Sequence, residues 1–343
     1  MTHPSLRSIL GFCLFGASLL AYGAAGATDN IAARVGYIPI LGASQIFIAE
    51  KEGWAREAGF DLRFTTFESG PNMIPALASG TLDIYVGGIA PLAVARAKGI
   101  DVRVVAATAT NEMTVTAGPK LAEFFQPGVT AAESFKRFHA ATGRPAKLAA
   151  QPPGSVPHAT LVHWLFEAAH VDRADFDVIG MGIDATQQAL LAGAIDGCAL
   201  REPAVTVSEK RDPRIKIVAL GNDMFPDQPG TVVAVSGPFL DKHRAAVEKL
   251  VAALVRATTL IKTDPDRAAG PIEAALGKGI IDHATIVQAL ASPASTFISD
   301  PRVITAPFAA MQAYQVKIGT LDKEAPLEGL FEQALYDRAA KTN

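Results

Sequence analysis

The sequence predicts an α/β protein in which two similar lobes face each other across a cleft. Segments typical of strands and of helices alternate from about residue 33 onward, which is the pattern of doubly wound α/β sheets. Residues 67–91 also have a near-copy in residues 178–203. With 343 residues, the chain is long enough for two domains that each bury a core.

The near-copy extends beyond one short motif. The first copy reads ALASGTLD over residues 76–83, and the second reads ALLAGAID over residues 189–196. Asp196 follows Asp83 by 113 residues, and Pro152 follows Pro39 by the same interval. A helix end followed by a strand is common in α/β proteins, so one match would mean little. Two matches at one interval indicate an internal duplication of a whole βαβαβ unit.

The elements of the first unit follow from apolar runs and from glycine stops. The run at 33–39 is apolar throughout, as in a parallel strand buried on both faces. A helix then begins near Leu41 and is closed by Gly59. The remaining predicted elements are strands at 60–67, 82–86 and 102–107 and helices at 73–79 and 91–98.

The second unit begins near residue 147, and a helical tail follows it. We expect strands at 147–150, 176–180 and 197–200, with a helix at 158–170. Strands at 114–117 and 231–236 bracket this unit, where the chain would cross between the lobes. We expect the tail to return to the first lobe as helices at about 240–263, 265–277, 283–291, 305–318 and 325–340.

These elements give a predicted division of the chain. Residues 28–112 with 229–343 would form one lobe, residues 113–228 the other, and hinges would lie near 110–113 and 223–231. Residues 1–27 have the features of a signal peptide: Arg7, an apolar run at 9–20, and small residues before a cleavage site after Ala27, with Gly23 as the alternative position. Cleavage removes Cys13 and leaves Cys198 as a single thiol, which we expect to be buried.

Composition narrows the possible partners. The chain is 49% hydrophobic and 19% charged, which is typical of globular proteins. Its formal charge is −3 and no run of lysine or arginine occurs, so neither nucleic acid nor an acidic membrane surface is an expected partner. We expect a monomer that binds a small molecule.

Ligands of open parallel sheets bind beyond the carboxyl ends of the strands, where helix N-termini offer free N–H groups and partial positive charge. The candidate ligand-binding residues in the first lobe are Leu41, Gly42, Ser44, Gln45, Ser69, Gly70, Asn72, Gly88, Ile89 and Asn111. Those in the second lobe are Gly154, Ser155, His158, Asp184, Arg201 and Glu202.

Each candidate also has a structural interpretation. Ser44 and Ser155 could cap helices, and the asparagines could stabilise turns. Arg201 could make a bidentate contact to a carboxylate or sulfonate, or it could pair with Glu202 or with a residue of the other lobe. His158 could be a surface histidine at a helix start, and Asp184 an exposed loop carboxylate.

The sequence does not favour catalysis. It has no G-x-S-x-G, H-E-x-x-H or P-loop pattern. His158 and His163 do not share a helix face, so they cannot form a metal pair. We therefore predict a protein that is not an enzyme and that has no cofactor and no metal.

The residues at 76–84, the following Gly87-Gly88, and the motifs at Val35-Gly36-Tyr37 and Glu202-Pro203 resemble a known family. They are similar to the periplasmic substrate-binding proteins of ABC importers for nitrate, sulfonates and taurine. The resemblance implies a type II periplasmic-binding-protein fold, in which each lobe is a doubly wound mixed sheet with helices on both faces. It also implies a periplasmic location, closure of the lobes on a ligand, and delivery of that ligand to a membrane permease.

The resemblance leaves the ligand and two other functional classes open. A sulfonate or taurine-like anion is the first choice, followed by an aromatic carboxylate or a thiamine-pyrimidine precursor. The same fold resembles enzymes of thiamine-pyrimidine and menaquinone biosynthesis, although the cysteine-rich iron motif of the thiamine enzymes is absent from this sequence. A sensor module that reports to a membrane kinase is the third class.

Overall fold

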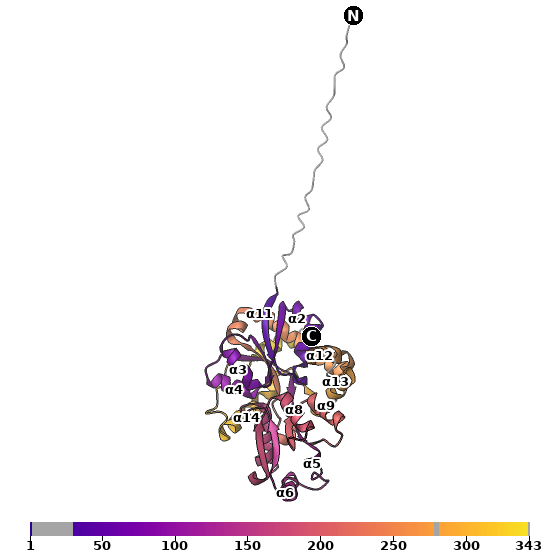
Figure 1. Cartoon of the computed structure of the whole chain (residues 1–343). Coiled ribbons are helices and arrows are strands. Elements are labelled where there is room, and N and C mark those ends of the chain that lie inside the picture. Colours follow the sequence, from indigo (N-terminus) through magenta and orange to yellow (C-terminus); the bar gives the residue numbers. More distant parts are fainter. Residues whose placement is uncertain (2–29, 278–280, 342–343) are drawn as a thin grey trace.

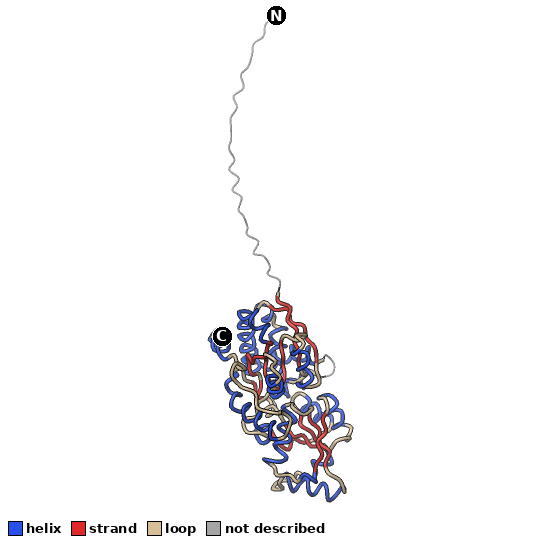
Figure 2. The backbone as a smooth tube through the Cα atoms, turned by 90° about the vertical axis from the view of Figure 1, so that its left-hand side faces the viewer, coloured by secondary structure: helices blue, strands red, loops and turns tan. Residues whose placement is uncertain are grey.

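The computed structural model describes Met1 and residues 30–277 and 281–341. Except for Met1, the predicted signal peptide lies outside the described residues. It therefore stays a prediction. Figure 2 shows two groups of strands, one above the other, each flanked by helices. Within the described residues, no helix is long and apolar enough to cross a membrane.

The first lobe is built on a mixed sheet with strand order β2-β1-β3-β11-β4. Its strands are β1 (Ile31–Tyr37), β2 (Phe60–Thr66), β3 (Ile84–Gly88), β4 (Val102–Ala107) and β11 (Thr231–Ser236). β1 pairs in parallel with β2 and β3, whereas β11 runs antiparallel between β3 and β4. All of β3 is buried, as expected for a central strand covered on both faces.

The second lobe has a separate sheet with order β10-β6-β9-β7-β8. Its strands are β6 (Thr114–Ala117), β7 (Ala146–Ala150), β8 (Phe176–Gly180), β9 (Gly197–Leu200) and β10 (Lys216–Leu220). β7 pairs in parallel with β8 and β9, and β6 is antiparallel to β9. When the second sheet is read from β8 to β10, each strand takes the place of a strand of the first sheet: β8, β7 and β9 correspond to β2, β1 and β3, and β6 and β10 correspond to β11 and β4. A short pair, β5 (Ala109–Thr110) with β12 (Thr296–Phe297), lies beside the crossover. The predicted two-lobed α/β fold is confirmed.

Helices flank both sheets (Figure 1). The first lobe has α1 (Ser44–Lys51), α2 (Trp54–Glu57), α3 (Gly70–Ala78) and α4 (Ala90–Ala97). The second lobe has α5 (Pro119–Ala122), α6 (Ala131–Thr142), α7 (Val156–His163), α8 (Ile183–Leu191), α9 (Ala204–Arg211) and α10 (Gly221–Met224). The tail forms α11 (Gly237–Thr263), α12 (Pro265–Leu276), α13 (His283–Leu290), α14 (Thr305–Lys317) and α15 (Gln333–Lys341).

Three predicted helices differ from the structure. The single helix expected from Leu41 to about residue 58 is wrong: a 3₁₀ turn at Leu41–Ala43 precedes α1, and Gly53, with a φ of 81°, separates α1 from α2. The helix expected at 158–170 ends as α7 at His163 and continues as a π-helical turn at Trp164–Ala168. The last helix begins only at Gln333.

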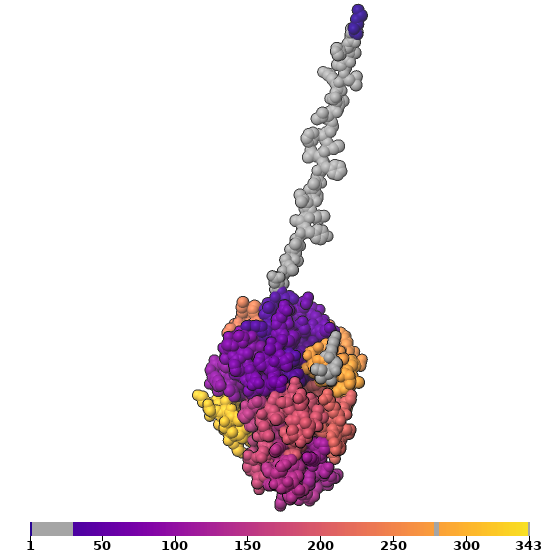
Figure 3. All heavy atoms as spheres, in the orientation of Figure 1, coloured from indigo at the N-terminus to yellow at the C-terminus, as the bar shows by residue number. Residues whose placement is uncertain are grey.

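The tail does not pack on the first lobe alone, contrary to the prediction. Helix α14 packs against α4 and also against α7 of the second lobe, and α13 contacts α9. Gln315 Nε2 donates to the carbonyl of Gly154 (3.4 Å), and Lys210 Nζ donates to Thr285 Oγ1 (2.6 Å). Figure 3 shows the resulting shape: the C-terminal residues, in orange and yellow, lie at both ends of the boundary between the lobes.

The predicted internal duplication is visible in matching bonds. The carboxylate of Asp83 accepts from the backbone N–H of Arg34 (2.9 Å) and from its guanidinium group. Asp196 accepts in the same way from the backbone N–H of Lys147 (2.8 Å) and from the guanidinium of Arg144. Lys147 follows Arg34 by the same 113 residues that separate the two aspartates. Each bond set fixes the start of a central strand, β3 or β9.

Two equivalent glycines, at the helix C-termini that precede β3 and β9, provide a paired test of the duplication. Gly80 and Gly193 have φ values of 68° and 67°, and a Cβ added at either position would have no atom within 4 Å. We expect Gly80→Ala and Gly193→Ala each to lower the free energy of unfolding by about 1–2 kcal/mol, since an L-residue is strained there. Urea denaturation of both variants measures this.

Gly270, inside α12, serves as the control because its surroundings are equally open but its φ is not positive. Gly270→Ala should raise the free energy of unfolding by up to about 1 kcal/mol. Unequal costs at Gly80 and Gly193 would argue against equivalent roles for the two turns.

Candidate functional site

The loops that follow β1, β3, β7 and β9 meet at the boundary between the lobes. Two crossovers form one side of this boundary and are tied to each other by Gln228. Its backbone carbonyl accepts from Thr110 Oγ1 (2.8 Å) and from the N–H of Asn111 (3.0 Å), and its Oε1 accepts from the N–H of Met113 (3.1 Å). Gln228 is fully buried, so the two crossovers are linked inside the protein.

Arg201 is the most buried charge at this boundary. It follows β9 and is only 2% exposed. Its Nη1 donates to Glu112 Oε1 (3.0 Å) and lies 3.4 Å from Thr231 Oγ1, while Nη2 donates to Gln151 Oε1 (3.2 Å). Thr231 in turn donates to Glu112 Oε1 (2.6 Å). Arg201 therefore connects the second lobe to both crossovers.

This network decides the structural interpretation of Arg201. The pairing with Glu202 is wrong, and the pairing with a residue of the other lobe is correct, because the partner is Glu112. Since the Arg201 and Glu112 side chains are 2% and 4% exposed, each depends on the other for compensation of its charge. The Nε atom of Arg201 is buried and has no hydrogen-bond partner among the described residues.

Glu202 is held by its own helix rather than by Arg201. Its carboxylate accepts from the N–H of Thr206 (3.0 Å) and from Thr206 Oγ1 (3.0 Å). Burial raises the pKa of Glu202, and hydrogen bonds from Ser292 and Thr206 offset only part of that effect. The backbone carbonyl of Glu202 accepts from the N–H of Leu41 (2.9 Å), so this residue also joins the two lobes.

The raised pKa of Glu202 predicts a pH dependence. A carboxyl whose pKa is higher in the folded state loses stabilisation as the pH rises from its unfolded pKa, about 4.3, through the folded value. We expect Glu202→Gln to gain stability relative to the wild type across this interval. Urea denaturation at several values from about pH 4 to about pH 8 measures the difference. A difference that does not change with pH would contradict the prediction.

The lobes touch each other at several further points. Gln151 Nε2 and the N–H of Ile183 both donate to the carbonyl of Glu68, at 3.2 and 3.3 Å. Gly88 at the end of β3 faces Val156 of α7, where a Cβ on Gly88 would lie 2.9 Å from Val156 Cγ2. A larger side chain at Gly88 would therefore push the lobes apart.

Several predicted residues carry buried polar atoms without partners at these loops. The hydroxyls of Ser44 and Ser69 and the Nδ1 atom of His158 have no hydrogen-bond partner among the described residues. Ser69 is the N-cap of α3, yet its hydroxyl makes no capping bond. Burial also lowers the pKa of His158, so its neutral form is favoured. Because buried polar groups are normally satisfied, these atoms are candidates for a hydrogen bond to water or to a ligand.

Other predicted residues have structural roles. Ser155 caps α7 by accepting from the N–H of His158 (3.2 Å), and Asn111 adopts a left-handed conformation with a φ of 49°. Gln45 donates to the carbonyl of Thr108 (2.8 Å). Asn72 is exposed on α3. Leu41, Gly42, Gly70, Gly88 and Ile89 are buried in the loops between the lobes.

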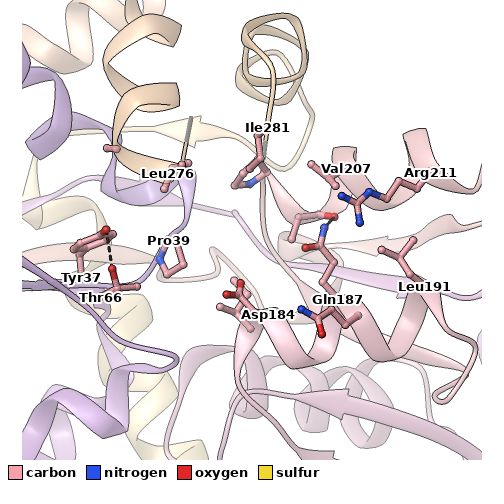
Figure 4. Close-up of a pocket in the computed structure, with 16 residues that line it drawn as sticks. Tyr37, Pro39, Thr66, Asp184, Gln187, Leu191, Val207, Arg211, Leu276 and Ile281 are labelled. Atoms are coloured by element: carbon pink, nitrogen blue, oxygen red, sulfur yellow. Dashed lines mark hydrogen bonds between the residues drawn. The ribbon is translucent and has the colours of Figure 1, made fainter. Parts of the chain in front are cut away.

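An open cavity of about 430 Å³ lies beside this packed region (Figure 4). Residues of both lobes and of the tail line it: Tyr37, Pro39, Thr66, Ile183, Asp184, Gln187, Gln188, Leu191, Pro203, Ala204, Val207, Arg211, Ala275, Leu276, Gly277 and Ile281. Its volume lies within the range of small-molecule sites. Of the sixteen predicted residues, only Asp184 lines this cavity.

The lining of this interlobe cavity combines apolar and polar side chains. Gln187 Nε2 donates to the carbonyl of Ala204 (3.0 Å), and Thr66 Oγ1 donates to the Tyr37 hydroxyl (2.8 Å), which leaves the phenol proton free to donate. Asp184 and Arg211 are exposed, and neither side chain is hydrogen-bonded or ion-paired to another described residue. One carboxylate and one guanidinium are thus available to a ligand.

Metal ligation and thiol chemistry depend on how the side chains that could perform them are grouped and buried. No group of three or more histidine, cysteine, aspartate or glutamate side chains among the described residues could hold a metal ion. Cys198 is buried, as predicted, and burial raises the pKa of its thiol, which favours the unreactive protonated form.

The sequence did not point to several residues of this region. Glu112, Gln151 and Thr231 were missed as partners of Arg201, and Tyr37 and Arg211 as lining of the cavity. A weak signal existed for Glu112, which lies at a predicted hinge. No local pattern marks Arg211, because it is the last residue of an ordinary helix.

Solved structures share this fold at low identity. The periplasmic nitrate-binding protein NrtA from Synechocystis PCC 6803 superposes with a TM-score of 0.75 over 92% of this chain and 89% of that chain, at 14% identity. The alkanesulfonate-binding protein SsuA from Xanthomonas axonopodis pv. citri, bound to MOPS, gives 0.70 over 89% and 99%, at 18% identity. At such identities the likeness shows the fold alone.

Sequence relatives are somewhat closer. A putative ABC transporter periplasmic binding protein from Brachyspira hyodysenteriae is 27% identical over 266 residues, 76% of this chain and 74% of that protein. A nitrate import ATP-binding protein from Synechococcus elongatus is 24% identical over 241 residues, 69% of this chain, which spans only 36% of that protein. The sequence pattern of the NMT1-like family matches residues 26–275, more than half of the chain, so this protein belongs to the NMT1-like family.

Proposed function

We propose that this protein is the solute-binding component of an ABC importer, exported to the periplasm, and that it captures a small organic molecule between its lobes. The observation that carries the proposal is the cavity of about 430 Å³ that both lobes and the tail line together. A ligand in that position contacts both lobes at once, so it favours the closed arrangement. The relatives named as binding proteins of ABC importers support the same function.

The hinge of this movement is proposed at the two crossovers that Gln228 ties together. These segments fall within the predicted hinges near 110–113 and 223–231. Some of the contacts between the lobes are single hydrogen bonds, such as that from the N–H of Leu41 to the carbonyl of Glu202, which can break without disturbing either sheet. A membrane permease is the proposed partner of the closed form, and a monomer is the proposed state.

A small organic anion is the first ligand class that we propose. Arg211 is the residue that supports an anionic ligand. Its guanidinium borders the cavity without a partner among the described residues, and it can bind a sulfonate or carboxylate in a bidentate manner. The N-terminus of α8, which carries partial positive charge, also lies at the cavity through Ile183 and Asp184. Arg201 is a weaker candidate for direct contact, since Glu112 already neutralises it.

A neutral aromatic or pyrimidine ligand is the second class. The observation that favours it is the Arg201–Glu112 pair, which leaves the Arg201 guanidinium compensated in the packed part of the boundary. Apolar residues such as Pro39, Val207 and Leu276 would contact a flat ring in the cavity.

Two linked measurements test the proposed function. Mass spectrometry of the purified protein under native conditions should detect a small molecule bound at one copy per chain. A panel of sulfonates, carboxylates and pyrimidines should then contain members that raise the melting temperature, because a ligand that binds only the folded state stabilises it. Turnover of any such compound by the purified protein would instead favour an enzyme of the same fold.

A further inference from the structure

The tail contacts the second lobe at two places, at opposite ends of the boundary between the lobes (Figure 1). Helix α14 packs against α7 at one end, and helix α13 contacts α9 at the other. The interlobe cavity lies at the α13 end, because its lining includes residues of α9, Leu276 at the end of α12, and Ile281 just before α13. The two contacts differ in chemistry.

The contact between α14 and α7 is largely apolar and continuous with the core. The ring of His163, at the end of α7, packs on two aromatic rings, with its centroid 4.5 Å from that of Phe225 and 4.8 Å from that of Tyr314 on α14. The Nδ1 atom of His163 is hydrogen-bonded to the carbonyl of Met224 (2.7 Å). Tyr314, Phe225 and Leu161 of α7 belong to one hydrophobic cluster that includes residues of both sheets. Since Phe225 lies in the second crossover, this contact adjoins the proposed hinge.

The contact between α13 and α9 is polar and lies between two separate cores. Lys210 Nζ donates to Thr285 Oγ1 (2.6 Å) and lies 3.8 Å from Asp282 Oδ2. Ile286 of α13 packs in a hydrophobic cluster with residues of α1, α11 and α12. Val205 of α9 belongs to a different cluster, which is formed within the second lobe.

This end of the boundary has the features of a contact that forms and breaks. The side chains of Lys210 and Asp282 are 43% and 69% exposed, and exposed pairs of this kind contribute little to stability. Next to the pair, the walls of the cavity stand apart: Figure 4 shows Leu276 on one side and Arg211 on the other. Separation at this end therefore breaks polar contacts and leaves both cores intact.

We propose that the second lobe turns about the α14–α7 contact and separates from the tail at α13, so that the interlobe cavity opens at the end where Lys210 bridges α9 and α13. The proposal rests on the proposed function and identifies the end at which a ligand enters. Lys210 does not line the cavity. It is a positioning residue, because its bond to α13 holds Arg211, its neighbour on α9, near the wall that the tail forms.

Reversal of one charge tests the proposal. Lys210→Glu places a carboxylate beside Asp282 and should drive α9 and α13 apart. Small-angle X-ray scattering measures the radius of gyration of the purified protein after bound small molecules have been removed by partial unfolding and dialysis. We expect this radius, about 20 Å for a compact chain of this length, to rise by roughly 0.5–1 Å in the variant.

Two further variants are the controls. Lys317 Nζ donates to Glu167 Oε1 (2.6 Å), so Lys317→Glu places the same repulsion at the α14 end, where the apolar core should keep the radius of gyration unchanged. Asp282 caps α13 by accepting from the N–H of Thr285, and asparagine can replace it as a cap. The double variant Lys210→Glu/Asp282→Asn removes the repulsion and should restore the radius of the wild type. Circular dichroism verifies the fold of each variant.

Each result supports or overturns one part of the proposal. An increase in Lys317→Glu equal to that in Lys210→Glu would overturn the pivot at α14. An unchanged radius in Lys210→Glu, or an increase that Asp282→Asn does not reverse, would overturn the role of Lys210. If Lys210→Glu does not fold, Lys210→Met, which removes the bond without adding a charge, should show a smaller increase, and no increase there would be equally contrary. These measurements use no bound compound, so their failure leaves the proposed function to its own tests.

Discussion

Replacement of Arg201 by methionine is expected to lower the free energy of unfolding by about 3–5 kcal/mol. The reason is that Glu112 would remain buried without a compensating charge, and Gln151 and Thr231 would lose a hydrogen-bond partner. Methionine has a similar length and no charge, so the effect reports the loss of the ion pair rather than a cavity. Urea denaturation followed by circular dichroism measures it.

Two controls accompany this variant. Arg214 pairs with Asp212 in the open, with 76% of its side chain exposed, so Arg214→Met should cause no measurable change. The double variant Arg201→Met/Glu112→Gln should recover much of the lost stability, because it removes both buried charges together. If the single Arg201 variant is as stable as the wild type, the boundary must be open to water in solution.

The second large effect is expected from filling the interlobe cavity. Ala204 lies at the first position of α9 and lines the cavity. Ala204→Trp should weaken binding of the co-purified ligand by at least about a hundredfold, the equivalent of roughly 2.7 kcal/mol. The indole ring would occupy the space that the ligand needs. Ala204 itself is buried and belongs to the core of the second lobe, so a thermal denaturation curve of the variant verifies that it folds. Isothermal titration calorimetry with that ligand measures the loss.

Ala192→Trp is the matched control for this variant. Ala192 is exposed at the end of α8 and does not line the cavity. The same ring placed there should leave the affinity unchanged. Equal binding by both variants and the wild type would show that the ligand lies outside the interlobe cavity.

The sequence predicted the architecture well because the signals for it are local. Runs of apolar residues place strands such as β6, β8 and β11 at their observed bounds. The motif ending at Asp83 and its copy ending at Asp196 fold alike, because each aspartate closes a helix end onto a strand with the same backbone bond. Two equal units joined by crossovers then place the carboxyl ends of both central sheets at one boundary.

The site was predicted only in part, because its partners are set by the packing of segments far apart in sequence. Arg201 was recognised as informative, but its partner Glu112 is 89 residues away and belongs to a crossover. The cavity is lined by Arg211 and Leu276 because the tail bends back over α9, which no pattern in the tail indicates. The predicted helix N-termini identified the edge of each sheet that faces the other lobe. They did not show which loops at that edge would be packed between the lobes and which would line the cavity.

The duplicated fold also explains how one ligand could close the protein. Each sheet is covered by its own helices, whereas the lobes meet through hydrogen bonds, one buried ion pair and the packing of the tail helices α13 and α14 on α9 and α7. The ion pair lies at the crossovers, so it can persist while the outer parts of the lobes separate.

Small-angle X-ray scattering of the purified protein, with and without the ligand identified by mass spectrometry, tests the central claim most directly. We expect the radius of gyration to decrease when the ligand binds, because the two lobes close around it. Tight binding with an unchanged radius of gyration would contradict capture by lobe closure.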